Sequence, residues 1–253
     1  MPSETILVLG GTREAAELAD RLVAARPDAR IVTSLAGRTR DPAAIAGEVR
    51  SGGFGGANGL AAWMRENAVT TLIDASHPFA TAISANAARA AEIASVPRLR
   101  LVRPAWTAEA GDLWKPVPTL DAAAAALPSG AVALLALGRQ HLAPFAARTD
   151  CRFVVRSVDA PQPPLPFAAG LLLGKPSTDP DEEAALFQRL DVSHLVCRNS
   201  GGAGAHAKIV AARRLALPVV MIERPPLPEG AVHGTVEQVL AAIGIPDDER
   251  KGP

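Results

Sequence analysis

Short apolar runs that end in a glycine or polar turn constrain the fold of this 253-residue chain more than any other feature. The first run, Thr5–Leu9, is broken by the glycines and threonine at 10–12. A helical pattern follows, with Ala15, Leu18 and Leu22 on one face. Apolar runs without polar alternation are typical of buried parallel strands. Their alternation with helical patterns predicts an α/β protein with helices on both faces of a parallel sheet.

The same order of apolar runs occurs twice along the chain. The matching segments are 6–11 with 131–139, 71–78 with 194–202, and 98–104 with 218–225. The stretch from Pro104 to Pro128 contains tryptophans and prolines that interrupt any periodicity, so the boundary between the halves is expected there. We therefore predict two Rossmann-like parallel-sheet halves facing a central cleft, with domains at 1–104 and 105–253.

Composition and charge exclude several classes of protein. Lys+Arg and Asp+Glu each number 26, so the formal net charge is zero and nucleic acid is not an expected partner. No apolar run reaches the roughly 18 residues of a membrane span, and the first residues show no signal peptide, so we expect a cytoplasmic protein with no membrane partner. The sequence leaves the oligomeric state open, with a monomer as one alternative. The two cysteines form no CxxC and the five histidines have no metal-ligand spacing, so no metal is expected.

The turn after the first strand is a candidate phosphate site. It consists of Gly10, Gly11, Thr12, Arg13 and Glu14, between a buried strand and a helix. Backbone N–H groups and the positive end of the helix attract phosphate at such a turn, and glycines let a pyrophosphate approach. The sequence lacks GxGxxG, so a tight turn without a ligand is the alternative interpretation.

The end of the second strand indicates which dinucleotide to expect. NAD-binding Rossmann folds carry Asp or Glu there for the ribose 2′-hydroxyl. This chain instead has Ser34, Gly37, Arg38 and Thr39. An arginine suits a 2′-phosphate, so Arg38 predicts NADP(H), and the alternative is a solvated loop arginine.

Two further segments complete the expected cofactor and catalytic site. Five glycines within 52–59, Gly53 and Gly55 among them, predict backbone at positive φ or backbone approached closely by another group. Ser76 and His77 follow the apolar strand 71–75, at the strand end where open α/β sheets hold their ligands. His77 is a candidate proton donor there, and a hydrogen-bonding strut is the alternative.

A second anion site is expected in the second half, where a glycine-rich segment follows the strand 194–198. Its expected ligand-binding residues are Arg139, Arg198, Asn199, Ser200, Gly201 and Lys208. Cations, amide and hydroxyl groups at a strand-to-helix junction suit a ligand with carboxylates. Lys208 is the second candidate proton donor. A glycine-rich turn with surface cations is the alternative.

Other nucleotide-dependent and hydrolytic families do not fit the sequence. The chain has no tyrosine, and short-chain dehydrogenases need a catalytic one. The segment Gly170–Lys175 is one residue short of a P-loop, and Pro176 follows the lysine. The GxSxG motif of α/β-hydrolases is absent.

The chain resembles the precorrin-6A reductase family. The similarity rests on LGGTREAAELA, SLAGRT, GGFGG, DASHPFA, LRLVRPAW and CRNSGGAGAHAKIVAARRLALPVVMIERP, which occur in this order. The resemblance implies reduction of one double bond of precorrin-6A to give precorrin-6B in cobalamin biosynthesis, with NADPH as cofactor. The residue motifs themselves assign NADP binding to 1–104 and macrocycle binding to 105–253. A cobalt-precorrin-6A reductase and a non-catalytic NADP-binding sensor are the alternatives.

Overall fold

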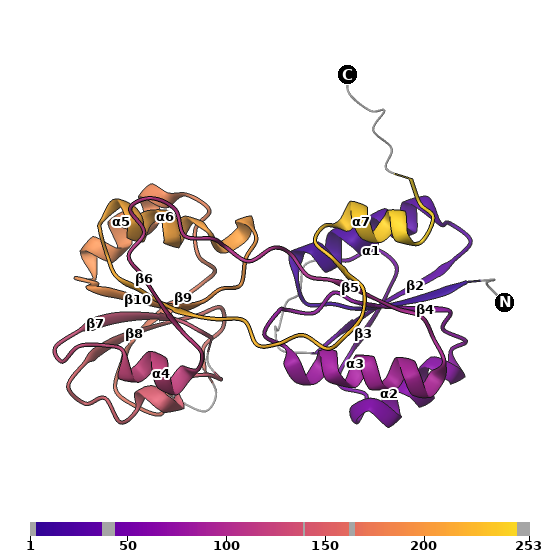
Figure 1. Ribbon diagram of the computed structural model, residues 1–253, viewed down its shortest axis with the longest axis horizontal. Coiled ribbons are helices and arrows are strands. Elements are labelled where there is room, and N and C mark those ends of the chain that lie inside the picture. The colour runs from indigo at the N-terminus through magenta and orange to yellow at the C-terminus, as the bar shows by residue number, and fades with distance from the viewer. Residues whose placement is uncertain (1–3, 37–43, 139, 162–164, 247–253) are drawn as a thin grey trace, which may run out of the picture. The chain divides into compact units, whose positions relative to one another are not determined.

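The computed structural model describes residues 4–36, 44–138, 140–161 and 165–246. The chain forms two compact units, which Figure 1 shows coloured along the chain. Unit 1 comprises Met1–Pro104 and Pro226–Pro253, and unit 2 comprises Ala105–Pro225. Each unit contains one six-stranded sheet in which all neighbouring strands are parallel. The predicted α/β class with two parallel sheets is therefore confirmed.

Unit 1 has the strand order β12-β5-β4-β1-β2-β3. Its elements are β1 (Thr5–Leu9), α1 (Arg13–Ala25), β2 (Arg30–Leu35), β3 (Glu48–Ser51), α2 (Gly56–Glu66), β4 (Thr71–Asp74), α3 (Thr81–Ala94), β5 (Arg98–Leu101), β12 (Val232–His233) and α7 (Val236–Ala242). From β1 the chain proceeds outward through β2 and β3, and then returns to the other side of β1 with β4. The order of strands therefore reverses between β1 and β4, and ligands of open α/β sheets bind at the carboxyl ends of the strands at such a point.

Helices cover both faces of the sheet in unit 1, which explains the apolar run Ile6–Leu9 in β1. Successive side chains of β1 point to opposite faces. Ile6 and Val8 lie in the core under α1 and α7, whereas Leu7 and Leu9 lie in the core under α2 and α3. Figure 1 shows these two pairs of helices on opposite faces of the sheet.

Unit 2 has the strand order β6-β11-β10-β7-β8-β9. Its elements are β6 (Trp114–Val117), α4 (Leu120–Ala125), β7 (Val132–Ala136), the 3₁₀ turn η1 (Ala143–Phe145), β8 (Arg152–Ser157), β9 (Gly170–Leu173), α5 (Pro180–Arg189), β10 (His194–Arg198), the 3₁₀ turn η2 (Ala203–Ala205), α6 (Ala207–Arg214) and β11 (Val219–Ile222). Helices α5 and α6 cover one face, where Phe187 and Ile209 pack on Leu134 and Leu195. Helix α4 lies on the opposite face in Figure 1.

The sheet order confirms the internal repeat. Strands β7, β10 and β11 take the places in unit 2 that β1, β4 and β5 take in unit 1. The chain exchanges the sixth strand of each sheet between the units. After β5 it enters unit 2 as β6, which pairs with β11, and after β11 it returns to unit 1 as β12, which pairs with β5. A helix capped by a threonine follows each exchanged strand, with Thr119 capping α4 and Thr235 capping α7.

This exchange corrects the predicted domain division. Unit 2 begins at Ala105, as expected, but Pro226–Pro253 belongs to unit 1 and not to the second half. Helix α7 buries Val239 and Leu240 in the core that α1 covers, and β12 adds to the edge of β5. Because β12 has only two residues, no apolar run marks this return in the sequence.

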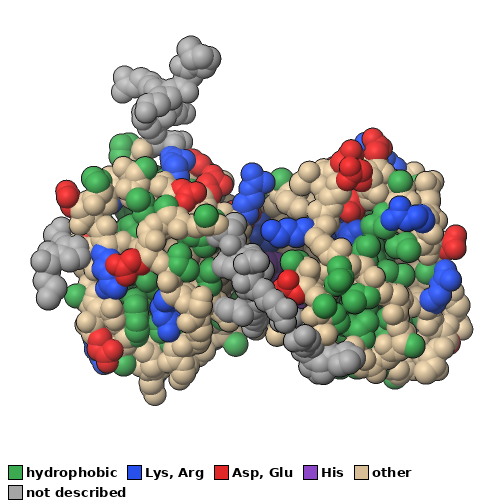
Figure 2. Space-filling model, turned by 180° about the vertical axis from the view of Figure 1, so that it is seen from behind, with side chains coloured by type: hydrophobic (Ala, Val, Ile, Leu, Met, Phe, Trp, Pro, Cys, Tyr) green, Lys and Arg blue, Asp and Glu red, His purple; other side chains and the backbone are tan. Residues whose placement is uncertain are grey.

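The charged surface agrees with the balanced composition. Figure 2 shows acidic side chains close to basic ones on the face of each unit that it draws. Among the described residues, no helix has both the length and the apolar character that crossing a membrane requires.

Candidate functional site

The turn after β1 is built around Gly10, Gly11 and Thr12. Gly10 donates its N–H to the Ser34 carbonyl at 2.9 Å, and a Cβ at Gly10 would lie 2.8 Å from Cγ2 of Thr33. Gly11 has φ +107°, which favours glycine, and no atom lies within 4 Å of the place its Cβ would take. The Thr12 hydroxyl caps α1 by accepting from the Ala15 N–H at 3.1 Å and donates to the Ala75 carbonyl at 3.0 Å. Gly10 and Thr12 thus shape the turn, and Gly11 leaves it open.

The first turn of α1 presents backbone N–H groups with no partner inside the helix, at the positive end of its dipole. Arg13 is exposed there. Glu14 does not oppose an anion with its full charge, because Nη1 of Arg103 lies 2.8 Å from its Oε2. Arg103 follows β5, and sequence reasoning gave it no role. The glycine turn, the helix end and this neutralised carboxylate form a site that suits phosphate.

A buried polar network holds the end of β4. Asp74 is 1% exposed, and its Oδ1 accepts from the N–H of Ser76 at 3.2 Å and from the Ser76 hydroxyl at 2.6 Å. On the neighbouring strand, Nε of Arg100 lies 3.2 Å from Oδ2 of Asp74, an ion-pair contact without hydrogen-bond angles. Arg100 also donates to Oγ of Ser84 at 3.1 Å. This network fixes the orientation of Ser76, whose hydroxyl donates to Asp74 within the protein.

His77 follows in the same loop. Its Nδ1 accepts from the N–H of Phe79 at 3.2 Å. Since that nitrogen acts as an acceptor, the neutral ring carries its proton on Nε2. The arrangement is compatible with both roles considered for His77. Its Nδ1 makes a hydrogen bond within the loop, as a strut would, and this bond orients the ring so that Nε2–H remains the side that could donate a proton.

At the ends of β2 and β3, Ser34 lies opposite Arg50. Nη1 of Arg50 donates to Oγ of Ser34 at 3.1 Å and to the Gly52 carbonyl at 2.9 Å. The guanidinium also lies over the Phe54 ring, 3.8 Å from its centroid. Sequence reasoning missed Arg50. The predicted residues Gly37, Arg38 and Thr39 lie outside the described residues.

The glycine cluster at 52–59, which runs into the first turn of α2, is explained mostly by backbone conformation. Gly52, Gly55 and Gly56 all have positive φ, and Gly55 is the N-cap of α2. A Cβ at Gly59 would lie 1.7 Å from the Phe54 carbonyl oxygen, so the loop packs directly on the helix. Gly53 differs, because it has no positive φ and its Cβ would meet no atom within 4 Å. Both predicted causes of the cluster, positive φ and close approach of backbone, are therefore present within the protein.

In unit 2, the loop after β10 is folded around Trp106. Oδ1 of Asn199 accepts from the Trp106 N–H at 2.8 Å, and Nδ2 of Asn199 donates to the Trp106 carbonyl at 2.9 Å. The indole N–H of Trp106 donates to the Gly202 carbonyl at 2.9 Å. Arg224 binds the carbonyls of Asn199 and Ser200. The amide of Asn199, predicted to bind substrate, thus holds the loop.

The remaining predicted residues of unit 2 differ in accessibility. Arg198 ends β10 and is partly exposed, and Gly201 has φ +66° in the loop that follows. Lys208 is only 5% exposed, and its Nζ donates to the Ala205 carbonyl at 2.8 Å and lies 4.8 Å from the Trp106 ring centroid. Its ammonium therefore stabilises the loop from within. Arg139 lies outside the described residues.

The two units differ where the repeat predicts equivalence. Strand β1 leads through a glycine turn into the 13-residue helix α1. Strand β7 leads through Gly138, and in the described residues before β8 only the 3₁₀ turn η1 follows. Within the described residues, unit 2 therefore offers no long helix N-terminus at this place, in contrast to unit 1.

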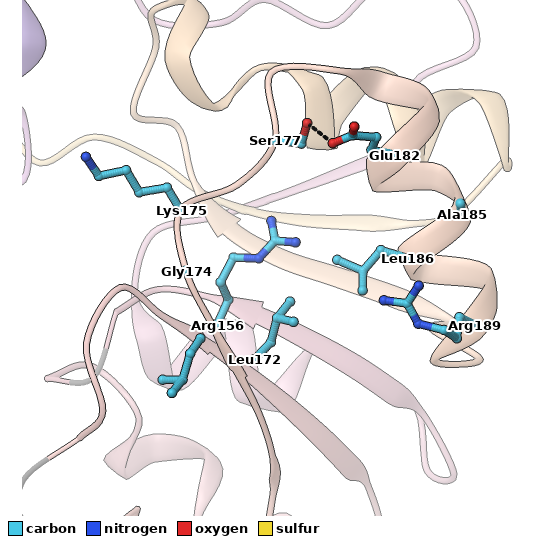
Figure 3. Close-up of a pocket in the computed structure, with 10 residues that line it drawn as sticks. Arg156, Leu172, Gly174, Lys175, Ser177, Glu182, Ala185, Leu186 and Arg189 are labelled. Carbon is cyan, nitrogen blue, oxygen red and sulfur yellow. Dashed lines mark hydrogen bonds between the residues drawn. The ribbon is translucent and has the colours of Figure 1, made fainter.

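A pocket of about 400 Å³ lies in unit 2 beside β8, β9 and α5. Figure 3 shows Arg156 and Leu172 from the strands, and Leu186 and Arg189 from α5, around it. Arg156 is buried and already paired, with Nη1 2.7 Å and Nη2 3.0 Å from the Glu183 carboxylate oxygens. Its charge is therefore neutralised within the protein.

The fold and these loops define a class, which is an α/β protein of two Rossmann-type sheets with an open glycine turn before the first helix. Residues 5–244 match the family model described as Precorrin-6x reductase CbiJ/CobK. The chain belongs to this family, and is therefore an oxidoreductase.

Individual relatives are similar to this chain over nearly its full length and support the family assignment. The precorrin-6A reductase of Rhodobacter capsulatus is 43% identical, over 93% of this chain and 94% of its own length. That of Mycobacterium tuberculosis is 39% identical, over 95% and 98%. The solved structure of a CobK precorrin-6A reductase has a TM-score of 0.89 and 41% identity, covering 96% of this chain and 98% of that one. The resemblance seen in the sequence motifs is thus confirmed.

Proposed function

We propose that this protein reduces precorrin-6A to precorrin-6B in cobalamin biosynthesis, with NADPH as the cofactor bound by unit 1. The observation that carries the proposal is identity of about two fifths, over nearly the full length, with relatives called precorrin-6A reductase. A cobalt-precorrin-6A reductase, from Priestia megaterium, is 29% identical over 94% of the chain. The metal-free tetrapyrrole is therefore the better-supported substrate.

The residues of unit 1 fit a dinucleotide. The first-turn N–H groups of α1 and the open space beside Gly11 would accept the pyrophosphate, and the ends of β2 and β3 would face the adenosine ribose. A bound nicotinamide supplies the hydride, so the protein must hold its ring against the substrate and exclude alternative orientations. Such positioning of two reactants contributes up to about 7–11 kcal/mol.

Reduction of a carbon–carbon or carbon–nitrogen double bond needs one hydride and one proton. A protonated macrocycle nitrogen can supply the proton without a protein acid. If a side chain does so, Nε2–H of His77 is better placed than Lys208, because Lys208 is buried and already donates to Ala205. Unit 2 would bind the carboxylates of the macrocycle through Arg198 and Arg139. Ser200 and Gly201 belong to the loop that follows Arg198.

Turnover of purified precorrin-6A with NADPH tests the proposal. We expect one NADPH to be oxidised for each precorrin-6A consumed. The mass of the product should exceed that of precorrin-6A by two hydrogen atoms. Turnover with NADH should be slower. Cobalt-precorrin-6A, assayed in parallel, should be the poorer substrate. NADPH binding without oxidation in the presence of either tetrapyrrole would instead support a sensor and overturn the proposal.

A further inference from the structure

Arg50 lies in the region where a Rossmann fold contacts the 2′-position of the adenosine ribose of its dinucleotide. That position is the carboxyl end of the second strand, where NAD enzymes carry an acid. In this chain β2 ends with Thr33, Ser34 and Leu35, and none of these is acidic. Arg50 stands opposite Ser34 on the neighbouring strand β3. A cation therefore lies at the carboxyl ends of β2 and β3, the region where an NAD enzyme has a carboxylate.

The guanidinium of Arg50 is held in one orientation. Nη1 donates to Ser34 and to the Gly52 carbonyl, and Nη2 donates to the Gly53 carbonyl at 3.3 Å. One face lies on Phe54, and the Phe54 ring is in turn fixed edge-on by Trp63, with centroids 5.5 Å apart. A planar cation fixed in this way loses little conformational freedom when it binds a ligand.

The charge of Arg50 is not balanced by any carboxylate among the described residues, since its acceptors are a hydroxyl and two carbonyls. Other arginines behave differently. Nε and Nη2 of Arg30 bind both oxygens of Glu48, and the same two atoms of Arg213 bind Asp112. Nε of Arg50 has no acceptor within the part of the chain that the structure describes. An edge suited to two oxygens of an anion is therefore available.

The internal repeat supplies a comparison within the same chain. The N–H of Gly52 donates to Leu35 and that of Gly174 donates to Ser157, both at 2.9 Å, so the two strand ends correspond. In this alignment Leu172 takes the place of Arg50, and Arg156 takes the place of Ser34. Unit 2 thus has a guanidinium at the equivalent strand end, but Glu183 neutralises it. Of these two guanidiniums, only that of Arg50 in unit 1 has no carboxylate partner among the described residues.

We propose that Arg50 binds the 2′-phosphate of NADPH, with the Ser34 hydroxyl as a second ligand, and so determines the preference for NADPH over NADH. This inference rests on the proposed function, because it assumes a dinucleotide in unit 1. The phosphate would bind the free edge of the guanidinium while Phe54 supports its face. Arg38, just past β2, is then an auxiliary cation at most.

Isothermal titration with 2′,5′-ADP and 5′-AMP tests this role without the tetrapyrrole. The proteins are wild type, Arg50→Met, Arg50→Lys and, as a matched loss of one surface arginine, Arg89→Met, all at one moderate salt concentration because phosphate contacts are screened. We expect Arg50→Met to weaken 2′,5′-ADP about tenfold to a hundredfold, while 5′-AMP changes little. Arg50→Lys should restore part of the loss, and Arg89→Met should resemble wild type. Thermal unfolding reports whether each variant is folded.

The outcomes separate this inference from the proposed function. A wild-type protein that prefers 2′,5′-ADP, together with an Arg50→Met variant that keeps this preference, overturns the role of Arg50 alone. Loss of the preference in Arg38→Ala but not in Arg50→Met would do the same and assign the phosphate to Arg38. A wild-type protein that binds both nucleotides equally, or neither, overturns both NADPH specificity and the role of Arg50.

Discussion

Gly53 separates the two reasons for which a glycine can stand in a loop. Gly55 must be glycine because of its φ of +77°, whereas neither φ nor a neighbouring atom explains Gly53. If the cofactor passes over this loop, Gly53→Ala should raise the KM for NADPH by about tenfold, or about 1.4 kcal/mol, without lowering the melting temperature. Steady-state kinetics and thermal unfolding measure the two effects.

Gly204→Ala is the matched control, because Gly204 in unit 2 has equally open surroundings and no positive φ. It should leave both the KM for NADPH and the melting temperature unchanged. An unchanged KM in Gly53→Ala would show that the cofactor does not approach the loop before α2.

Substitution of Arg198 and substitution of Lys208, two predicted substrate-binding cations of unit 2, should have different effects on stability. Arg198→Ala is expected to weaken precorrin-6A by about tenfold to a hundredfold and leave NADPH binding intact, since a charge-assisted hydrogen bond contributes about 1.5–3 kcal/mol. Lys208→Ala should also lower the melting temperature, because the buried ammonium supports Ala205 and Trp106. Fluorescence titration of each ligand and thermal melts distinguish them. Loss of NADPH binding with tetrapyrrole binding retained would mean that the units are assigned in reverse.

The sequence located the loops of the site better than it identified the working atoms within them. Glycines and polar residues after an apolar run mark a strand end, so the places of Gly11 and His77 in loops that follow β1 and β4 could be predicted. The pattern does not show that Thr12 and Asn199 use their side chains on the protein's own backbone. Arg50 was missed because β3, with its mostly exposed residues Glu48–Ser51, gives no apolar signal.

At the scale of elements, buried central strands were predictable and edge strands were not. Strands β1, β4, β7 and β10 are covered on both faces, so their central residues are apolar. The edge strands β3 and β12 are short and exposed, and their places depend on pairing partners far along the chain. For the same reason the return of the chain to unit 1 could not be predicted.

That return predicts where the C-terminal helix contributes stability. Leu240 of α7 is buried in the same core cluster as Ile6 and Leu18. Leu240→Ala should lower the free energy of unfolding of unit 1 by about 2–5 kcal/mol, because it leaves a cavity under α7. Native-state hydrogen exchange should show β1 and β4 losing protection while β7 and β10 keep theirs.

Phe187→Ala provides the mirror experiment, because Phe187 is fully buried in the core between α5 and the sheet of unit 2. It should reduce protection in β7 and β10 and spare β1 and β4. If Leu240→Ala instead weakens β7 and β10, the segment 226–253 does not stabilise unit 1.

At the scale of the whole molecule, two copies of one topology have acquired different loops. In unit 1 the loop after the central strand β1 continues into α1, and Arg50 at the ends of β2 and β3 has no carboxylate partner among the described residues. In unit 2 the equivalent loop forms a 3₁₀ turn, and the equivalent cation is paired with Glu183. The two sheets thus share one topology, and their loops differ at the two places where unit 1 is proposed to bind a nucleotide.

This asymmetry predicts how NADPH changes local stability across the molecule. A ligand that binds only the native form adds about 2.7 kcal/mol to its stability when its free concentration is 100 times its Kd. The increase should be largest for amides that exchange through opening of unit 1, above all in the first turn of α1 and at 52–55. Amides of β10 and α6 should slow less. Hydrogen exchange with NADPH, compared with NADH at the same concentration, measures the effect, and NADH should protect more weakly because it lacks the 2′-phosphate. Strongest protection at Gly174–Ser177 would mean that unit 2 binds the nucleotide, since that loop is the counterpart of 52–55.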